Sequence, residues 1–147
     1  MLDGTDLEII ELLEQDSRRP LADIGRLVSL SAPAVKRRMD RLEELGVITG
    51  YTITLDHGKL GRPLEAFCEL RFDGTTTVDD ISTVAKDIPE VGAVFTTAGD
   101  PDALVWMRVK DVDDLKRVID RIRRSGIVLG TKTLMVLGTW SARRPMR

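Results

Sequence analysis

The sequence contains few of the residues that usually carry redox or metal chemistry. Its 147 residues include a single cysteine, Cys68, and a single histidine, His57. One cysteine excludes an internal disulfide framework, and without a Cys/His cluster we expect neither a zinc site nor any other metal or cofactor. Cys68 lies among residues that alternate as in a strand, so we expect a buried and unreactive thiol.

Long apolar runs and a strong charge of one sign are also missing. No segment approaches the roughly 18 consecutive apolar residues that a membrane span needs. The first residues, MLDGTDLEII, have neither a basic region nor a cleavage signature, so we expect a cytoplasmic protein with no membrane partner. The formal net charge of −2 argues against a protein that coats nucleic acid through bulk charge. A DNA-binding protein with this balance must concentrate its positive charge locally.

Residues 21–50 carry the pattern of a helix-turn-helix. They read LADIGRLVSLSAPAVKRRMDRLEELGVITG. A short apolar helix stops near residue 30, and Ser31 stands where an N-cap belongs, with Pro33 in the first turn of the next helix. Gly46 is well placed to end that second helix. The spacing therefore predicts two helices joined by a tight turn.

The second helix of this pair has one apolar and one basic side. Val35, Met39 and Leu42 recur at helical spacing and form the apolar stripe. Lys36, Arg37 and Arg41 fall on the far side. A helix pinned by its apolar face and presenting cations outward suits the major groove of double-stranded DNA. We expect the following residues to face DNA: Ser31, Ala32, Pro33, Lys36, Arg37 and Arg41.

Two alternatives stay open for this helix. A solvated amphipathic helix in a small helical domain would show the same charge pattern. Arg38 flanks the apolar stripe, so it either faces DNA or bridges to an acidic neighbour such as Glu11 or Glu14. Arg is the residue best suited to a bidentate contact with guanine, whereas Lys and Ser more often hold phosphate.

The segments on either side of this pattern complete a first domain over residues 1–50. Asp3 can cap a helix that runs through Glu14, with Asp6 at its third position. This helix is acidic outside, so we expect it to complete a three-helix core rather than to follow phosphates. Residues 47–55 are β-branched and partly alternating, which predicts a strand leaving the DNA-binding unit. Residues 51–63 then form a strand and linker, and the turn residues at 56–63 mark the domain boundary.

Residues 64–147 have the element order β-α-β-β-α-β, which predicts a ferredoxin-like domain: an antiparallel sheet of four strands with both helices on one face. The fold class is therefore α+β, with a winged helix-turn-helix first. Pro89 and Gly126 end the two helices. The predicted elements are strand Glu65 to Phe72, helix Val78 to Ile88, strand Val91 to Ala98, strand Ala103 to Val109, helix Val112 to Arg124 and strand Val128 to Trp140.

Two of these strands are apolar on both sides. Leu104 and Trp106 alternate with Val105 and Met107, and the last strand behaves in the same way. Two helices cover one face of such a sheet, so the other face needs a cover as well. The sheet of a second copy is the simplest cover, which predicts at least a homodimer. We expect Trp106 and Trp140 to be sheet or interface residues.

With both halves in view, the chain resembles the Lrp/AsnC family of feast/famine transcriptional regulators over nearly its whole length. No single motif carries the resemblance; the order and spacing of the markers do. In the first half these are Leu2-Asp3, Asp6, Arg18, Leu30-Ser31, Val35, Arg37-Arg38, Leu42, Gly46-Val47-Ile48 and Gly50-Tyr51. In the second half they are Pro89-Glu90-Val91, Gly99-Asp100, Asp102, Thr131 and Thr133.

The resemblance implies a sequence-specific regulator that binds DNA through its first domain. It implies a second domain that dimerises, assembles further into tetramers or octamers, and senses an amino acid or related small molecule at subunit interfaces. The loop that joins the two middle strands would then supply carboxylates for an α-amino group, and the last strand would supply hydroxyls. The expected effector residues are Ala98, Gly99, Asp100, Asp102, Thr131 and Thr133.

Three positions depart from the usual family pattern. Gly25 stands where the family usually has Ala, and Ser29 where a turn Gly is common; both residues are small, so we expect the helices still to dock. Pro101 stands where an aromatic residue often precedes the aspartate matched by Asp102, which changes the wall of the expected effector site. An Asp- and Pro-rich hairpin without any ligand is the alternative for this loop.

Two other classes of protein remain alternatives. Some Lrp-like proteins are sirohaem decarboxylases, which is one alternative. That reaction would require His and Arg side chains around a large pocket, whereas the sole histidine, His57, lies in the linker. An architectural protein that wraps DNA without an effector is the third reading. The basic tail Ser141 to Arg147 would either help on DNA or have no role.

Overall fold

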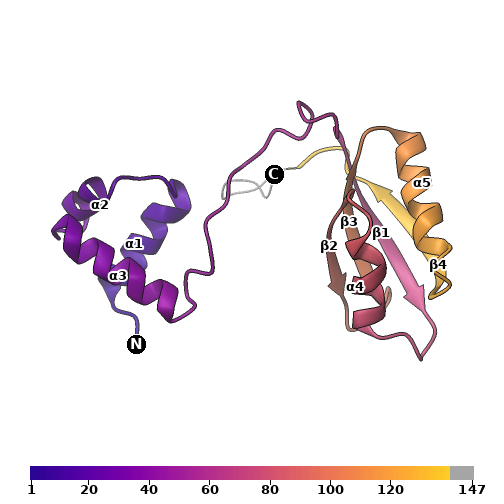
Figure 1. Ribbon diagram of the computed structural model, residues 1–147, viewed down its shortest axis with the longest axis horizontal. Helices are drawn as coiled ribbons and strands as arrows, with labels where there is room; N and C mark the ends of the chain where they lie inside the picture. The colour runs from indigo at the N-terminus through magenta and orange to yellow at the C-terminus, as the bar shows by residue number, and fades with distance from the viewer. Residues whose placement is uncertain (140–147) are drawn as a thin grey trace. The chain divides into compact units, whose positions relative to one another are not determined.

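A computed structural model describes residues 1–139 of the chain (Figure 1). The chain divides into two compact units, Met1–Thr54 and Leu55–Arg147. The first unit holds three helices, α1 (Gly4–Gln15), α2 (Leu21–Leu27) and α3 (Ala32–Glu44). No helix within residues 1–139 has the length and apolarity required to cross a membrane.

The ends of α1 and α3 are fixed by the residues that the sequence points to. Asp3 accepts a hydrogen bond from the N–H of Asp6 at 2.9 Å, and the carboxylate of Asp6 accepts from the N–H of Asp3 at 3.0 Å, which is a reciprocal capping box. The hydroxyl of Ser31 accepts from the N–H of Ala34 at 3.3 Å. Gly46 ends α3 in the left-handed conformation, with φ of 68°. The predicted caps are confirmed.

The turn between α2 and α3 brings two backbone segments unusually close. The N–H of Leu30 donates to the carbonyl of Gly25 at 2.8 Å. A Cβ placed on Gly25 would lie 2.4 Å from the carbonyl oxygen of Leu30. Ser29 takes φ of 55°, a left-handed conformation that a non-glycine residue seldom adopts. The turn is therefore tight enough to need a residue without a side chain at position 25.

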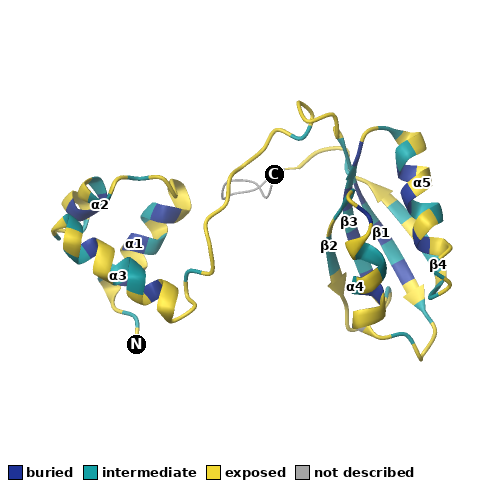
Figure 2. Cartoon of the chain, in the orientation of Figure 1, coloured by how far each residue is buried: buried dark blue, intermediate teal, exposed yellow. Residues whose placement is uncertain are grey.

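A small apolar core joins the three helices. Its buried side chains come from all of them, as the dark segments in Figure 2 show. Leu12, Met39 and Ile48 pack around this core. The buried members of the core are Ile9, Leu13, Ile24 and Val35. The apolar stripe of α3 therefore holds the helix in place and leaves its opposite side in solvent.

The predicted strand over residues 47–55 is wrong for the single chain. None of these residues is in a strand, and residues 49–55 make no backbone hydrogen bond with another segment of the described chain. A strand needs a partner for its N–H and C=O groups, and none is present here. Tyr51 and Ile53 are instead exposed.

The second unit is the expected β-α-β-β-α-β arrangement. Its strands pair antiparallel in the order β2-β3-β1-β4. Its elements are β1 (Leu64–Phe72), α4 (Val78–Lys86), β2 (Val91–Thr96), β3 (Ala103–Val109), α5 (Val112–Arg123) and β4 (Val128–Met135). The α+β fold with a helix-turn-helix in front of a four-stranded antiparallel sheet is confirmed.

Three predicted ends within the sheet domain were too long. Helix α4 stops at Lys86, β2 stops at Thr96 and β4 stops at Met135. Strand β4 pairs with β1 alone, its ladder ends at the pair Ala66–Met135, and one further backbone hydrogen bond, from the N–H of Val136 to the carbonyl of Glu65 at 2.9 Å, lies near the start of β1. Trp140 and the basic tail 141–147 lie outside the described residues.

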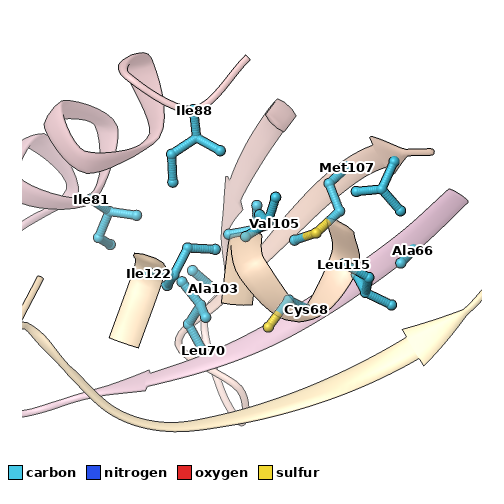
Figure 3. Close-up of a cluster of buried hydrophobic side chains, with 12 residues drawn as sticks. Ala66, Cys68, Leu70, Ile81, Ile88, Ala103, Val105, Met107, Leu115 and Ile122 are labelled. Atoms are coloured by element: carbon cyan, nitrogen blue, oxygen red, sulfur yellow. The ribbon is translucent and has the colours of Figure 1, made fainter. Parts of the chain in front are cut away.

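Both helices of the second unit cover the same face of the sheet. Figure 3 shows side chains of α4 and α5 gathered over β1 and β3. Inward positions on β1 alternate with outward ones, and the inward thiol of Cys68 is fully buried, as predicted. The helix-covered core includes Ala66, Cys68, Leu70, Ile81, Ile88, Val105, Met107, Leu115, Val118 and Ile122.

The opposite face of the sheet, which we call the open face, has apolar rows bordered by charges. The pairing register places Trp106, Phe67 and Leu134 in one row, and Leu104, Glu69 and Lys132 in the next. Phe95, beside Leu104, is 48% exposed, and Leu134 is 43% exposed. No described helix covers this face, so it is an apolar surface that the fold leaves uncovered.

The segment that follows Leu55 is fastened to the second unit at two places. Arg108 lies over the ring of Trp106, 4.2 Å from its centroid, and its Nη1 lies 2.9 Å from Nε2 of His57. Arg62 Nη1 donates to the carbonyl of Pro89 at 3.2 Å. Within the described residues, the part of the connecting segment that is fixed to the sheet domain therefore begins at His57.

Candidate nucleic-acid interface and effector region

Helix α3 presents its first turn and its outer side to solvent. Val35 and Leu42 are fully buried and fix the rotation of the helix about its own axis. Pro33 and Arg37, one turn apart, are exposed on the opposite side. Ser31 caps the first turn, so free backbone N–H groups and the positive end of the helix dipole lie at this end.

The basic side chains of α3 differ in whether an acid already holds them. Lys36 pairs with Asp40 one turn later on the same helix. Arg38 contacts Asp3 and Asp6, each at 2.7 Å, and Arg41 contacts Asp6 as well. Arg37 has no ion-pair or hydrogen-bond partner within residues 1–139. Among the contacts of residues 1–139, it is the one guanidinium of α3 that no acid holds.

The partner of Arg38 is not the one that the sequence suggested. Of the two alternatives left open for Arg38, the structure shows the bridge to an acidic neighbour, but the acids are Asp3 and Asp6 rather than Glu11 or Glu14. The first turn of α1, rather than its middle, therefore lies beside α3. Helical spacing predicted both helices correctly, but it carried no information on which turn of one meets which turn of the other.

Asp6 is a fully buried carboxylate that stays ionised. Burial acts to raise the pKa of Asp6, but the N–H of Asp3 and the guanidinium groups of Arg38 and Arg41 outweigh it, and the pKa is lowered from its ordinary value of 3.8. Hydrogen bonding to Arg38 also lowers the pKa of Asp3. These acids therefore remain charged at neutral pH.

The candidate effector loop is braced by contacts within the sheet domain. Gly99 has φ of 146°, which favours glycine. Asp102 accepts from the N–H of Phe72 at 2.8 Å, and its own N–H donates to the carbonyl of Leu70 at 3.1 Å. Asp100 pairs with Arg71 at 2.8 Å on the surface. One loop carboxylate is therefore structural, and the other is paired but accessible.

The two threonines of β4 face the helices rather than the loop. Thr131 accepts from Nε and Nη2 of Arg123 at 2.9 and 2.6 Å. Thr133 donates weakly to the sulfur of Cys68 at 3.9 Å, and burial raises the pKa of that thiol. Leu70 pairs with Ala103 on one side and Thr131 on the other, so β1 separates the loop end from these hydroxyls.

Two arginines beside the candidate residues were missed by the sequence analysis. Arg71 reaches Asp100 from β1, and Arg123 reaches Thr131 from α5. The alternation of β1 placed Arg71 on the open face, but only the loop geometry brings it to Asp100. Within residues 1–139, no group of three or more His, Cys, Asp or Glu side chains is placed to hold a metal ion.

Comparisons with known proteins cover both units. The family described as "AsnC-type helix-turn-helix domain" matches residues 2–43, and "Lrp/AsnC ligand binding domain" matches residues 65–146. The HTH-type transcriptional regulator Rv2324 of Mycobacterium tuberculosis is 38% identical over 144 residues, which is 98% of this chain and 97% of that protein.

Solved structures share the fold of the whole chain. LrpC of B. subtilis has a TM-score of 0.87 at 26% identity, covering 97% of this chain and 99% of that one. The transcriptional regulator NMB0573 of Neisseria meningitidis, solved as a complex with L-Met, has a TM-score of 0.91 at 23% identity, covering 98% of this chain and 95% of that one. The second of these likenesses concerns the fold alone.

Proposed function

Because the chain belongs to the Lrp/AsnC family of transcriptional regulators, we propose that α3 reads a specific DNA operator and that an amino acid bound to the second unit changes this binding. The chain combines a DNA-binding helix-turn-helix with a ligand-binding domain. A regulator of this kind senses a small molecule in one unit and contacts DNA with the other.

The observation that carries the DNA-binding proposal is the state of Arg37. It lies on the outer side of a capped and docked helix, and it has no partner within the described chain. An unpaired guanidinium can donate two parallel hydrogen bonds to O6 and N7 of guanine in the major groove. Arg37 is therefore the side chain that we expect to read a base.

The other α3 candidates have supporting roles in this proposal. Ser31, Ala32 and Pro33 form the end of the helix that approaches the backbone, where N–H groups and the helix dipole favour a phosphate. Lys36 exchanges Asp40 for a phosphate when DNA is bound. Arg41 was expected to face DNA as well, but Asp6 holds it, so we do not count it among the proposed contacts.

The effector that we propose is an amino acid, held around the loop at residues 98–102. The paired but accessible carboxylate of Asp100 suits an α-amino group, and Arg71 beside it suits an α-carboxylate. Asp102 orients the loop, while Ala98 and Gly99 offer backbone groups. Thr131 and Thr133 were expected to join this site, but they face the helices on the other side of β1, so we leave them out of the proposed site. The L-Met complex of a protein with the same fold supports this class of ligand.

We propose that the open face is covered by the same face of a second copy. Its rows of Trp106, Phe67 and Leu134 are apolar, and the flanking Glu69 and Lys132 pair at 3.5 Å. A two-fold interface uses the same surface of both copies, so this face must be self-complementary. Such dimers would assemble further into tetramers or octamers, and an effector between subunits would then change how the DNA-binding units are held.

The first experiment is a mobility shift with DNA from upstream of the protein's own gene and its neighbours, at two salt concentrations and with a panel of amino acids. Specific retention that weakens with salt and changes with one amino acid is the expected result. Arg37→Ala should lower specific affinity by about 5- to 150-fold, since a bidentate base contact contributes roughly 1–3 kcal/mol. Arg121→Ala, which removes an exposed arginine of α5, is the matched control.

Other outcomes separate the competing readings. Specific retention that no amino acid alters would favour an architectural role. If the wild-type protein showed no preference for the operator and Arg37→Ala bound DNA with the same affinity, α3 would not be the DNA-reading helix. The relatives are named transcriptional regulators, which does not favour the sirohaem decarboxylase-type alternative.

Sedimentation equilibrium tests the proposed dimer. Leu134→Glu introduces a charge in the apolar row and should shift the protein toward the monomer. Val112→Glu is the matched control, because Val112 is also exposed but lies on α5, away from the open face. A Leu134→Glu protein with the mass of the wild type would refute this interface.

A further inference from the structure

The first turn of α1 supplies two carboxylates to one flank of α3. Asp3 and Asp6 contact Arg38, and Asp6 also contacts Arg41. The formal charges of these four groups cancel. Since Lys36 pairs with Asp40 as well, the recognition helix has less unpaired positive charge than its sequence suggests.

We propose that Asp3 and Asp6 are positioning residues that withhold Arg38 and Arg41 from the DNA backbone, so that specific contacts account for more of the binding. This inference rests on the proposed binding of DNA by α3. The two acids and two arginines together are called the α1 clamp below.

The geometry supports a fixed rather than a chance arrangement. Asp6 is fully buried and accepts from Arg38, from Arg41 and from the N–H of Asp3 at 3.0 Å, so its carboxylate has no freedom to turn away. Arg38 bridges two acids, each at 2.7 Å, and its side chain is only 29% exposed. Contacts from two directions hold an arginine more firmly than a single surface ion pair does.

The consequence for recognition follows from how charge acts on DNA. Contacts with phosphates are independent of sequence, and each one makes affinity fall more steeply with salt, by about 0.9 in the logarithmic slope. Withholding two arginines lowers affinity for every DNA alike. The contact made by Arg37 to a base then forms a larger share of the total binding free energy, while the ratio of operator to non-operator affinity is unchanged.

Asp3→Asn is the variant that tests the clamp. Asn caps a helix as well as Asp does, so α1 keeps its start, while Arg38 loses one of its two carboxylates. Glu11→Gln is the matched control, because it removes one exposed negative charge from α1 at a position with no described ion pair. Asp3→Ser, another capping residue, serves as a second variant if the first does not fold.

The measurement is the affinity of each protein for operator and for non-operator DNA, between about 50 and 200 mM salt. For Asp3→Asn we expect tighter binding to non-operator DNA and a steeper salt slope. One released contact adds about a 3.5-fold loss over this range. Affinity for operator DNA should rise by the same factor, so the ratio of operator to non-operator affinity should stay unchanged, and adding Arg38→Gln to Asp3→Asn should restore the wild-type slope.

Each result decides the question. An Asp3→Asn slope equal to that of Glu11→Gln would overturn the clamp while leaving the DNA-binding proposal in place. A wild-type protein with no preference for its operator would instead remove the proposed function itself, and the clamp with it. A steeper slope that persists when Arg38→Gln is added would show that Arg38 is not the released group and would also overturn the inference.

Discussion

Replacing Gly25 by alanine gives a direct test of the packing between α2 and α3. The new Cβ would lie 2.4 Å from the carbonyl oxygen of Leu30, whereas real contacts of this kind do not fall below 3.0 Å. The turn must therefore shift by at least about 0.6 Å. That shift strains the 2.8 Å hydrogen bond from the N–H of Leu30 to the carbonyl of Gly25.

Two effects of opposite sign set the size of the change. Alanine is favoured over glycine within a helix by about 1 kcal/mol. Overpacking typically costs about 1–3 kcal/mol, and loss of a hydrogen bond adds roughly 1 kcal/mol. The clash involves backbone, which yields less easily than the end of a side chain. We therefore expect Gly25→Ala to lower the unfolding free energy of the first unit by about 1–3 kcal/mol.

Urea unfolding can assign this change to the correct unit. Both tryptophans, Trp106 and Trp140, lie in the second half of the sequence, so their fluorescence reports on the second unit, whereas far-UV circular dichroism reports on both. At a slope of about 1 kcal/mol per molar urea, Gly25→Ala should shift the dichroism transition of the first unit down by about 1 M or more, with the fluorescence transition unchanged.

Gly4→Ala is the matched control for Gly25→Ala. Gly4 is the first residue of α1, and nothing lies within 4 Å of a Cβ placed there. This variant should leave the transition unchanged or raise it slightly. If Gly25→Ala raised the midpoint as Gly4→Ala does, the close approach of the two backbone segments would be wrong.

Three further predictions use groups already described. The pKa values of Asp3 and Asp6 are lowered from 3.8, so the stability that these carboxylates add to the first unit is present above that pH and is lost as the pH falls further. The first unit should therefore melt at a lower temperature at about pH 3 than at about pH 5. Asp3→Asn should make the melting temperature depend less on pH. Partial burial and a hydrogen bond to Glu43 raise the pKa of Tyr51 to about 12. The stability that the protonated tyrosine contributes is therefore present below pH 10 and is lost between about pH 10 and 12. Ultraviolet titration of this single tyrosine should show ionisation at high pH, and Glu43→Gln should move it to lower pH. Ser29→Gly relieves the strain of a left-handed φ, but the greater freedom of glycine in the unfolded chain offsets part of this gain in stability. Thermal unfolding should therefore show a stabilisation below about 1 kcal/mol. A clear loss of stability would contradict the strain at this turn.

The sequence predicted those features that depend on neighbouring residues. Capping by Asp3 and Ser31 and the left-handed end at Gly46 follow from local hydrogen bonding, and all are present. The alternation in β1 identified its buried face correctly, since side chains of a strand point to opposite faces in turn, whereas β3 is apolar on both sides and its sequence did not show which side is buried.

Features that depend on distant segments could not be predicted in this way. Residues 47–55 have the composition of a strand, but a strand forms only where another segment pairs with it. The contact of Arg38 with Asp3 and Asp6 depends on how α1 lies against α3, which helical spacing does not fix. The assignment of bases to Arg37 and of an effector to the loop at 98–102 stays a prediction.

The short free connection between the two units has a mechanical consequence for operator geometry. The hydroxyl of Tyr51 is bound to Glu43 at 2.8 Å, and His57 is fastened at Arg108, so five residues span the interval between them. Fully extended, the backbone from residue 51 to residue 57 covers about 20 Å. Each copy in a dimer would have one such tether.

Two fully extended tethers would add about 40 Å at most to the distance between the recognition helices, which is close to one helical turn of DNA at about 34–36 Å. The two half-sites of an operator could then move apart or together by about a turn without loss of the dimer. Spacings that place the half-sites on opposite sides of the duplex would need twisting as well as stretching, so operator strength should oscillate with half-site spacing at the period of the double helix.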